Sequence, residues 1–225
     1  MNQVTYKPWL AAALDLGTNS FHVTIVDTRA QPYRVLFRYG QKVQLGAGLD
    51  QANFLSTDAI DRGLNAIQIM ASQMTQVAPK NRHIVATNTL RVACNRQDFI
   101  QPAEEFLQAP IQVISGKREA ELIFAGVADE LSSHSLGSQD KLVIDIGGGT
   151  TEIAVMSLGG VVYSRSLRIA GDAMDVALQN YMREEYNLLI GDSTAEKIKK
   201  EVGTAIPTNN NKYPVKGRDI RSGTP

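Results

Sequence analysis

Two glycine-rich turns with the same layout constrain this sequence more than any other feature. The first spans residues 15–20 (DLGTNS) and the second residues 145–152 (DIGGGTTE). Each turn follows an apolar run, at residues 9–14 and 142–144, and precedes a run rich in β-branched residues. Short apolar runs bounded by glycine are typical of buried strands. The sequence therefore predicts the same unit twice: a strand, a tight acidic turn and a second strand.

The composition of the two turns predicts a phosphate site. Glycine permits a sharp turn and, lacking Cβ, lets a phosphate approach the main chain, and consecutive N–H groups in such a turn bind anions. The residues expected to contact phosphate are the glycines and the hydroxyl and amide residues of the turns: Gly17, Thr18, Asn19, Ser20, Gly147, Gly148, Gly149 and Thr150. One Asp-x-Gly turn alone would indicate an ordinary hairpin, but two copies with hydroxyl residues favour phosphate binding.

A carboxylate stands at the head of each turn, and it would repel phosphate unless a cation were bound with it. Asp15 and Asp145 are therefore candidate ligands of Mg²⁺, which prefers oxygen ligands and bridges to phosphate oxygens. Asp145 is the better candidate. Glu152 is a candidate second or indirect ligand, and the alternative for it is a strand residue paired across a sheet. No Gly-Lys-Ser/Thr follows the glycines, and a strand rather than a helix is expected after them, so a P-loop or Rossmann turn is not indicated.

Composition excludes some classes of partner. The length of 225 residues is enough for one large or two small domains. The residues are 43% apolar, so the chain can build a sizeable core. Lys+Arg and Asp+Glu balance at 23 each, so we expect no nucleic-acid partner and no attraction to an anionic membrane. Cys94 is the only cysteine, which fits a reducing compartment. No apolar run approaches the roughly 20 residues of a transmembrane helix, and the N-terminus does not resemble a signal peptide. We expect a cytoplasmic protein.

Strand and helix patterns alternate through the middle of the chain. This order favours an α/β fold with helices packed on a mixed sheet. The expected elements are strands of a meander at 33–45, a helix with Ser56 as N-cap, a strand at 83–86, a loop at 87–91, a helix at 97–108, a strand at 111–114, a helix from Gly116, a linker at 131–140, a strand at 161–167, helices at 172–186 and 194–202, and a polar segment at 207–225.

Particular runs then suggest a family. They are LDLGTNSFH at 14–22, GQKVQLGAG at 40–48, ATNTLR at 86–91, ISGKREA at 114–120 and VIDIGGG at 143–149. Over residues 11–152 the chain resembles the exopolyphosphatase/guanosine pentaphosphate phosphatase (Ppx/GppA) family of the actin-like ATPase superfamily.

From residue 145 to residue 219 the sequence is more similar to the bacterial actin MreB. The matching runs are IAVMSLGGVVYS at 153–164, GDAMD at 171–175, AEKIKKEVG at 195–203 and VKGRD at 215–219. The chain thus resembles a mosaic. The resemblance implies an actin-like ATPase (ribonuclease H-like) fold, with one complete, phosphatase-like lobe at residues 1–135 and a truncated second lobe at 141–225.

The resemblance also implies roles for single residues. Glu119 would activate the attacking water, and Arg91 would bind phosphate. Glu196 and Lys199 match residues that lie near the ribose and base of the nucleotide in the bacterial actin. From the residues alone, Glu119 is better interpreted as a solvated glutamate favoured by the helix dipole, and the resemblance reverses that interpretation. Glu196 with Lys199 is equally well explained as a surface ion pair three residues apart.

The implied function is a Mg²⁺-dependent phosphohydrolase that releases terminal phosphate from inorganic polyphosphate or guanosine pentaphosphate. Members of the family often dimerise through C-terminal regions that this chain does not have, so a homodimer is a candidate assembly only. Two alternatives stay open: an ATP-binding, MreB-type filament protein, and an inactive fragment whose cleft is incomplete.

Overall fold

The computed structural model describes residues 5–130, 140–157, 160–204, 206 and 212–224. The chain divides into two compact units. The first consists of Met1–Asp145 with Glu152–Ser166, and the second of Ile146–Thr151 with Leu167–Pro225. The division into lobes expected from the sequence stays a prediction, because its boundary and most of the expected linker at 131–140 lie outside the described residues.

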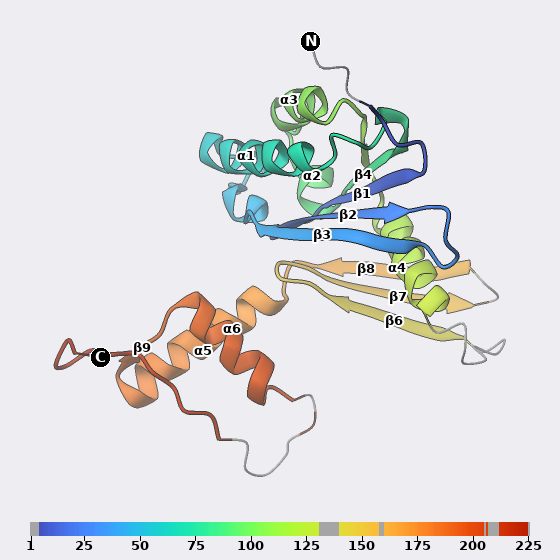
Figure 1. The fold of residues 1–225 in the computed structure, drawn as a ribbon. Coiled ribbons are helices and arrows are strands. Elements are labelled where there is room, and N and C mark those ends of the chain that lie inside the picture. Colours follow the sequence, from blue (N-terminus) through green and yellow to red (C-terminus); the bar gives the residue numbers. More distant parts are fainter. Residues whose placement is uncertain (1–4, 131–139, 158–159, 205, 207–211, 225) are drawn as a thin grey trace. The chain divides into compact units, whose positions relative to one another are not determined.

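A five-stranded mixed sheet forms the centre of the first unit (Figure 1). Its strands are β1 (Leu10–Leu16), β2 (Ser20–Asp27), β3 (Arg34–Lys42), β4 (Arg82–Ala86) and β5 (Ile111–Val113), in the spatial order β3-β2-β1-β4-β5. The first three strands are antiparallel, while β4 is parallel to β1 and β5 is parallel to β4. The expected α/β class with a mixed sheet is confirmed. Residues 33–45 contain one strand rather than several.

Helices follow the strands as the sequence pattern indicates. They are α1 (Thr57–Gln73), α2 (Asn88–Val92), α3 (Gln97–Leu107) and α4 (Gly116–Glu130), with short 3₁₀ turns η1 (Leu45–Gly48) and η2 (Pro79–Asn81). Ser56 is the N-cap of α1, and its side chain accepts a bond from the Ala59 N–H. The prediction of a loop at 87–91 is wrong, because Asn88–Val92 forms a short helix with Asn88, Thr89 and Leu90 buried. Tertiary packing overrides its weak local helix signal.

The hydrophobic core of the first unit lies between the sheet and helices α1 and α3, which stand together on one side of it (Figure 1). Phe21 of β2 and Phe99 of α3 meet edge to face, with ring centroids 6.0 Å apart. In β1, Leu14 and Leu16 are buried, each with 1% of its surface exposed. Successive side chains of a strand point to opposite faces, so Asp15 projects to the other face of the sheet.

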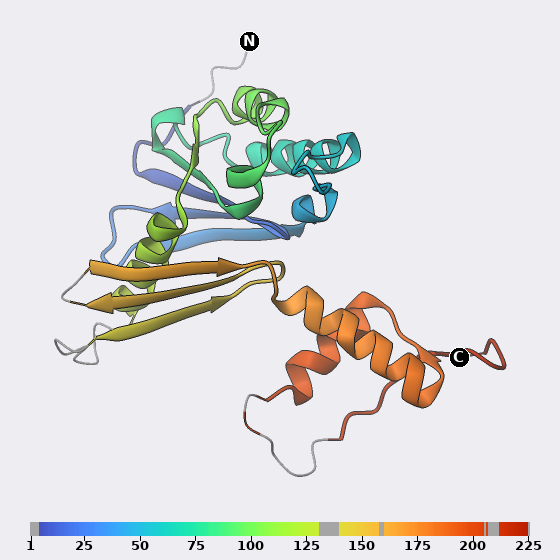
Figure 2. The same cartoon turned by 180° about the vertical axis from the view of Figure 1, so that it is seen from behind.

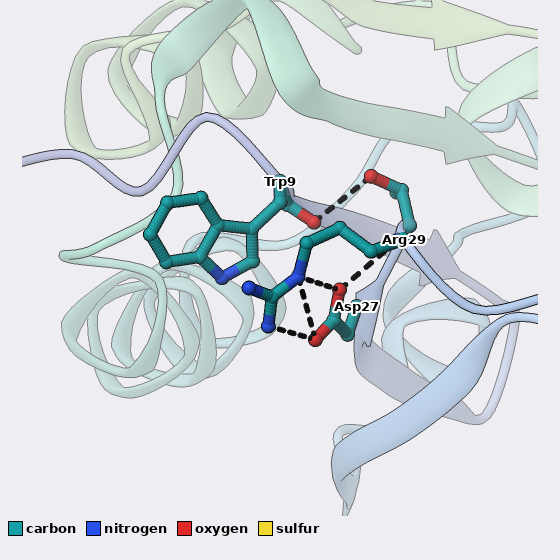
Figure 3. Close-up of polar contacts among 4 residues, drawn as sticks. Trp9, Asp27 and Arg29 are labelled. Carbon is teal, nitrogen blue, oxygen red and sulfur yellow. Dashed lines mark hydrogen bonds and ion pairs between the residues drawn. The ribbon is translucent and has the colours of Figure 1, made fainter.

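A polar cluster ties the start of β1 to the end of β2 (Figure 3). The Thr28 N–H donates to the Trp9 carbonyl at 2.9 Å. The guanidinium of Arg29 lies 4.6 Å from the centroid of the Trp9 ring and 2.6 Å from Asp27 Oδ2. Hydrogen bonds from Arg29 lower the pKa of Asp27 to about 2. These contacts hold the hairpin at the end opposite to its glycine turn.

A three-stranded sheet, in the order β6-β7-β8, contains the second strand–turn–strand unit. Its strands are β6 (Lys141–Ile146), β7 (Thr151–Ser157) and β8 (Gly160–Leu167). Glu152, Ala154 and Met156 alternate along β7 as buried residues. The strands expected on both sides of the second turn are confirmed.

The second unit is mainly a helix pair. It contains α5 (Gly171–Tyr186), α6 (Asp192–Val202) and the two-residue strands β9 (Leu188–Leu189) and β10 (Arg218–Asp219). Helices α5 and α6 lie side by side in both views (Figures 1 and 2). Both helices were expected from the sequence. None of the helices in the described ranges is long and apolar enough to cross a bilayer.

Candidate active site

The same hydrogen bond closes both glycine turns. The Gly17 N–H donates to the Ser20 carbonyl at 3.1 Å, and the Gly147 N–H donates to the Thr150 carbonyl at 2.9 Å. A Cβ on Gly17 would lie 2.8 Å from the Ser20 oxygen, and one on Gly147 would lie 3.2 Å from the Thr150 oxygen. The repeat seen in the sequence is therefore also a structural repeat. A side chain at position 17 would crowd the closing bond, and one at position 147 would be tight against it.

The first turn carries a buried hydroxyl that lacks a partner. Among the described residues, Thr18 Oγ1 is buried without a hydrogen bond. The backbone of the turn is fixed from the other side, since the Asn19 carbonyl accepts from Val43 and Gln44 at 2.8 Å and the Thr18 carbonyl accepts from Gly46 at 2.9 Å. A buried polar atom without a partner is unfavourable. A phosphate or hydrated cation at this turn would supply the missing bond.

The second turn is fixed to the start of α5 within the second unit. The Gly171 N–H donates to the Gly147 carbonyl at 3.1 Å, and the Asp172 N–H donates to the Gly148 carbonyl at 2.8 Å. Gly149 follows these two residues, and Thr150, immediately before β7, is buried.

Glu119 lies in the first turn of α4, where its side chain is 11% exposed. Its Oε2 is 3.1 Å from Arg91 Nη1, and the same nitrogen donates to the Ile114 carbonyl at 2.9 Å. Ser115 Oγ accepts from the Arg118 N–H at 3.2 Å and so caps the helix. Arg91 of α2 thus holds the carboxylate of Glu119 in place, and α2 is the segment that was predicted as a loop.

Four carboxylates influence one another in the first unit. Burial raises the pKa of Glu119 to about 7; Glu152 and Asp15 raise it as well, and Arg91 opposes them. Burial also raises the pKa of Asp15, as do Asp145 and Glu152, while His22 lowers it. Asp15 touches solvent, yet the protein around it limits its hydration. The structure thus brings Asp15, Arg91, Glu119, Asp145 and Glu152 into one electrostatic group.

The donor set of this group fits Mg²⁺. Within the described residues, no three His, Cys, Asp or Glu side chains converge as a closed metal cage. Mg²⁺ commonly keeps several waters and uses one or two carboxylates together with substrate phosphates, so neighbouring carboxylates beside a glycine turn suit it. Glu152 is 6% exposed, and its Oε1 accepts from Ser166 Oγ of β8 at 2.9 Å.

Glu196 and Lys199 lie on α6 in the second unit. Glu196 Oε1 is 2.7 Å from Lys200 Nζ, whereas Lys199 Nζ is 2.8 Å from Asp175 Oδ1 of α5 and donates to the Gly171 carbonyl at 2.9 Å. Asp175 is not predictable from the sequence, because no local spacing links it to Lys199. His22 was not predicted as a site residue, although it is the cross-strand neighbour of Asp15. The register of the predicted hairpin is the signal that could have found it.

A known protein family matches most of this chain. The model of the Ppx/GppA phosphatase family matches residues 24–221. The chain belongs to the Ppx/GppA phosphatase family. The match extends beyond residue 152, the limit of the phosphatase-like motifs, and includes the region of this Ppx/GppA chain that also resembles MreB.

Solved structures share the fold of this Ppx/GppA member. An exopolyphosphatase from Cytophaga hutchinsonii is 26% identical, with a TM-score of 0.60 over 78% of this chain and 60% of its own. The Aquifex aeolicus Ppx/GppA phosphatase, type II variant, is 22% identical, with a TM-score of 0.59 over 75% of this chain and 55% of its own. MreB5 of Spiroplasma citri bound to AMPPNP is 24% identical, with a TM-score of 0.63 over 96% of this chain and 70% of its own. The actin-like ATPase fold is confirmed. The chain spans little more than half the length of the two phosphatases.

Proposed function

We propose that this Ppx/GppA chain is a metal-dependent phosphohydrolase that removes the terminal phosphate from inorganic polyphosphate or guanosine pentaphosphate. The observation that carries the proposal is Glu119, a largely buried carboxylate paired with Arg91 at 3.1 Å and grouped with the carboxylates of both turns. Membership of the phosphatase family supports hydrolysis of a phosphate ester or anhydride. The likeness to an exopolyphosphatase supports a polyphosphate chain as the substrate.

Glu119 is the proposed general base. Its carboxylate accepts a proton from water as the water oxygen attacks the terminal phosphorus and the shortened phosphate chain leaves as an anion. A group with a pKa of about 7 is half ionised near neutral pH and is well matched to this transfer. Arg91 orients the carboxylate through Nη1, and the remaining N–H groups of the guanidinium bind phosphate oxygens.

The turns are the proposed phosphate-binding elements. The backbone N–H groups of Gly148 and Gly149 donate to phosphate oxygens. Gly17 and Gly147, whose own N–H groups close the turns, let a phosphate approach the main chain because they lack Cβ. Thr18, whose buried Oγ1 lacks a partner in the described part of the chain, is the side chain that a phosphate would satisfy best. Asn19, Ser20 and Thr150 add donors.

Asp145 and Asp15 are the proposed ligands of Mg²⁺, with Glu152 as a second or indirect ligand. When bound, Mg²⁺ supplies positive charge against the phosphate oxygens. Without that charge, the carboxylates repel one another, and this repulsion contributes to the raised pKa values of Asp15 and Glu119.

The direct test is phosphate release by the purified chain with Mg²⁺, with polyphosphate, guanosine pentaphosphate and ATP offered in parallel. Release from either of the first two, lost when EDTA is added, is the expected result. Release from ATP alone, together with sedimentation of filaments in ATP, would instead favour the MreB-type alternative. A chain folded by circular dichroism that releases phosphate from none of the three would show that the proposal is wrong for this chain.

A further inference from the structure

We infer that Lys199 is a positioning residue for the second phosphate turn, and not a ligand of a nucleotide base. Anchored by Asp175, Lys199 holds the first residue of α5, and α5 in turn holds the carbonyls of Gly147 and Gly148. The inference rests on the proposed function only in taking this turn as a phosphate site. Every contact that carries it lies within the second unit.

The ammonium group of Lys199 is anchored between α5 residues. Lys199 Nζ lies 2.8 Å from Asp175 Oδ1 and donates to the Gly171 carbonyl at 2.9 Å. The side chains of Lys199 and Asp175 are only 23% and 11% exposed. An ammonium has three donors; one is bonded to the Gly171 carbonyl, and Asp175 Oδ1 faces the charge as an ion-pair partner without a hydrogen bond from the described residues. A partly buried ion pair of this kind is screened by water and salt much less than a surface pair.

Hydrogen bonds from α5 then hold the turn. The Gly171 N–H donates to the Gly147 carbonyl and the Asp172 N–H to the Gly148 carbonyl, at 3.1 and 2.8 Å. In a planar trans peptide, the carbonyl of one residue and the N–H of the next point in opposite directions. Because both carbonyls point toward α5, the N–H groups of Gly148 and Gly149 point away from it. Those are the donors that a phosphate needs.

Gly171 lies where the ammonium group of Lys199 and the glycine turn meet. A Cβ on Gly171 would lie 2.9 Å from Lys199 Nζ and 3.2 Å from the Gly147 oxygen. The absence of a side chain at Gly171 lets the ammonium and the turn approach the same peptide closely. Lys199, Gly171 and Gly147 therefore form one packed connection from α6 to the turn.

The alternative role, in which Lys199 contacts the nucleoside of a substrate, makes a different prediction. A nucleoside contact would matter for guanosine pentaphosphate and not for inorganic polyphosphate, which has no base. A residue that positions the turn acts on both substrates alike, because both present a terminal phosphate.

The first experiment needs no activity. Amide hydrogen exchange of Gly171 and Asp172 is compared in the full chain and in its variants Lys199→Met, Lys199→Arg and Lys200→Met. Lys199→Met should speed exchange at these two amides by about tenfold or more, because their bonds to the turn open more often. Lys199→Arg should restore most of the protection. Lys200→Met removes an exposed lysine paired with Glu196 on the same helix and should change neither amide.

The second experiment measures kcat and KM for polyphosphate and guanosine pentaphosphate. Lys199→Met should reduce kcat/KM by a similar factor for both substrates. Unchanged exchange in Lys199→Met, or a loss confined to guanosine pentaphosphate, would overturn the inference. If the unaltered chain releases no phosphate, the proposed function fails while the exchange data still decide the role of Lys199. Asp175→Asn gives the same test if Lys199→Met does not fold.

Discussion

Arg91 Nη1 lies 3.1 Å from Glu119 Oε2, although the two residues are 28 positions apart and belong to different helices. Burial and the neighbouring carboxylates raise the pKa of Glu119, and Arg91 lowers it. The resulting value of about 7 is therefore a balance, in which Arg91 keeps a crowded carboxylate ionisable near neutral pH.

Replacing Glu119 should abolish turnover while leaving substrate binding intact. Glu119→Gln keeps the shape of the side chain but cannot accept a proton from water, so kcat should fall by about 100-fold or more while KM changes little. Steady-state phosphate release measures both. The matched control is Glu121→Gln, two residues along α4, where the carboxylate is 35% exposed and pairs with Arg118. Activity that survives in Glu119→Gln would refute the assigned role.

Replacing Arg91 should move the pH–rate profile. Arg91→Met removes the positive charge that favours ionised Glu119, so the pKa of the base should rise further. The rising limb of kcat/KM should then shift to higher pH by about one unit. Arg91→Lys retains the charge and should shift the limb less. A profile that keeps its midpoint in Arg91→Met would show that the ion pair does not tune Glu119.

Stability should depend on pH through Glu119. Its pKa is about 7 in the folded chain against an ordinary 4.5, so the native state binds this proton more tightly than the unfolded state. The stabilisation is complete below pH 4.5 and is lost as the pH rises through 7. Relative to the unaltered chain, Glu119→Gln should gain up to about 3 kcal/mol between pH 5 and 8. Urea unfolding without divalent metal measures this difference, and a constant difference would contradict the assignment.

The two glycine turns should differ in their tolerance of a methyl group. In Gly17→Ala the new Cβ would approach the Ser20 oxygen to 2.8 Å and disturb the closing bond, at a cost of about 1–3 kcal/mol. Gly147→Ala, with a clearance of 3.2 Å, should cost less. Gly126→Ala on α4 is the control: no atom of the described residues lies within 4 Å of the place that its methyl group would take, so it should stabilise the chain by up to about 1 kcal/mol. Thermal unfolding of the three variants gives the order.

Arg82 should be the most sensitive charged residue of the first unit. It is 8% exposed and donates to the carbonyls of Met74, Val77 and Leu107 at 2.7–3.1 Å, which lie at or just beyond the ends of α1 and α3. Arg82→Met leaves these oxygens buried without a donor and should cost about 3 kcal/mol or more.

The control for Arg82 is Arg38→Met, at an exposed position on β3, which should stay within about 0.5 kcal/mol. Urea denaturation midpoints compare the two variants. Equal stability of Arg82→Met and Arg38→Met would show that the carbonyls find other donors.

The sequence alone predicted the elements that local chemistry specifies. Glycine at positions 17 and 147, flanked by apolar and β-branched runs, predicts strand, turn and strand because sterics within a few residues allow little else. The Ser56 cap of α1 and the helix after Gly116 follow from equally local patterns.

The tertiary structure decided how the chemical groups are paired and how they ionise. The helix at Arg91, the contact of Arg91 with Glu119 and the pairing of Lys199 with Asp175 all join separate elements. No spacing along the chain encodes them, because they depend on which buried faces meet. The pKa of Glu119 is of the same kind: desolvation and neighbouring charges exist only once β1, β7, α2 and α4 have packed, so the sequence could name this glutamate but not its proton affinity.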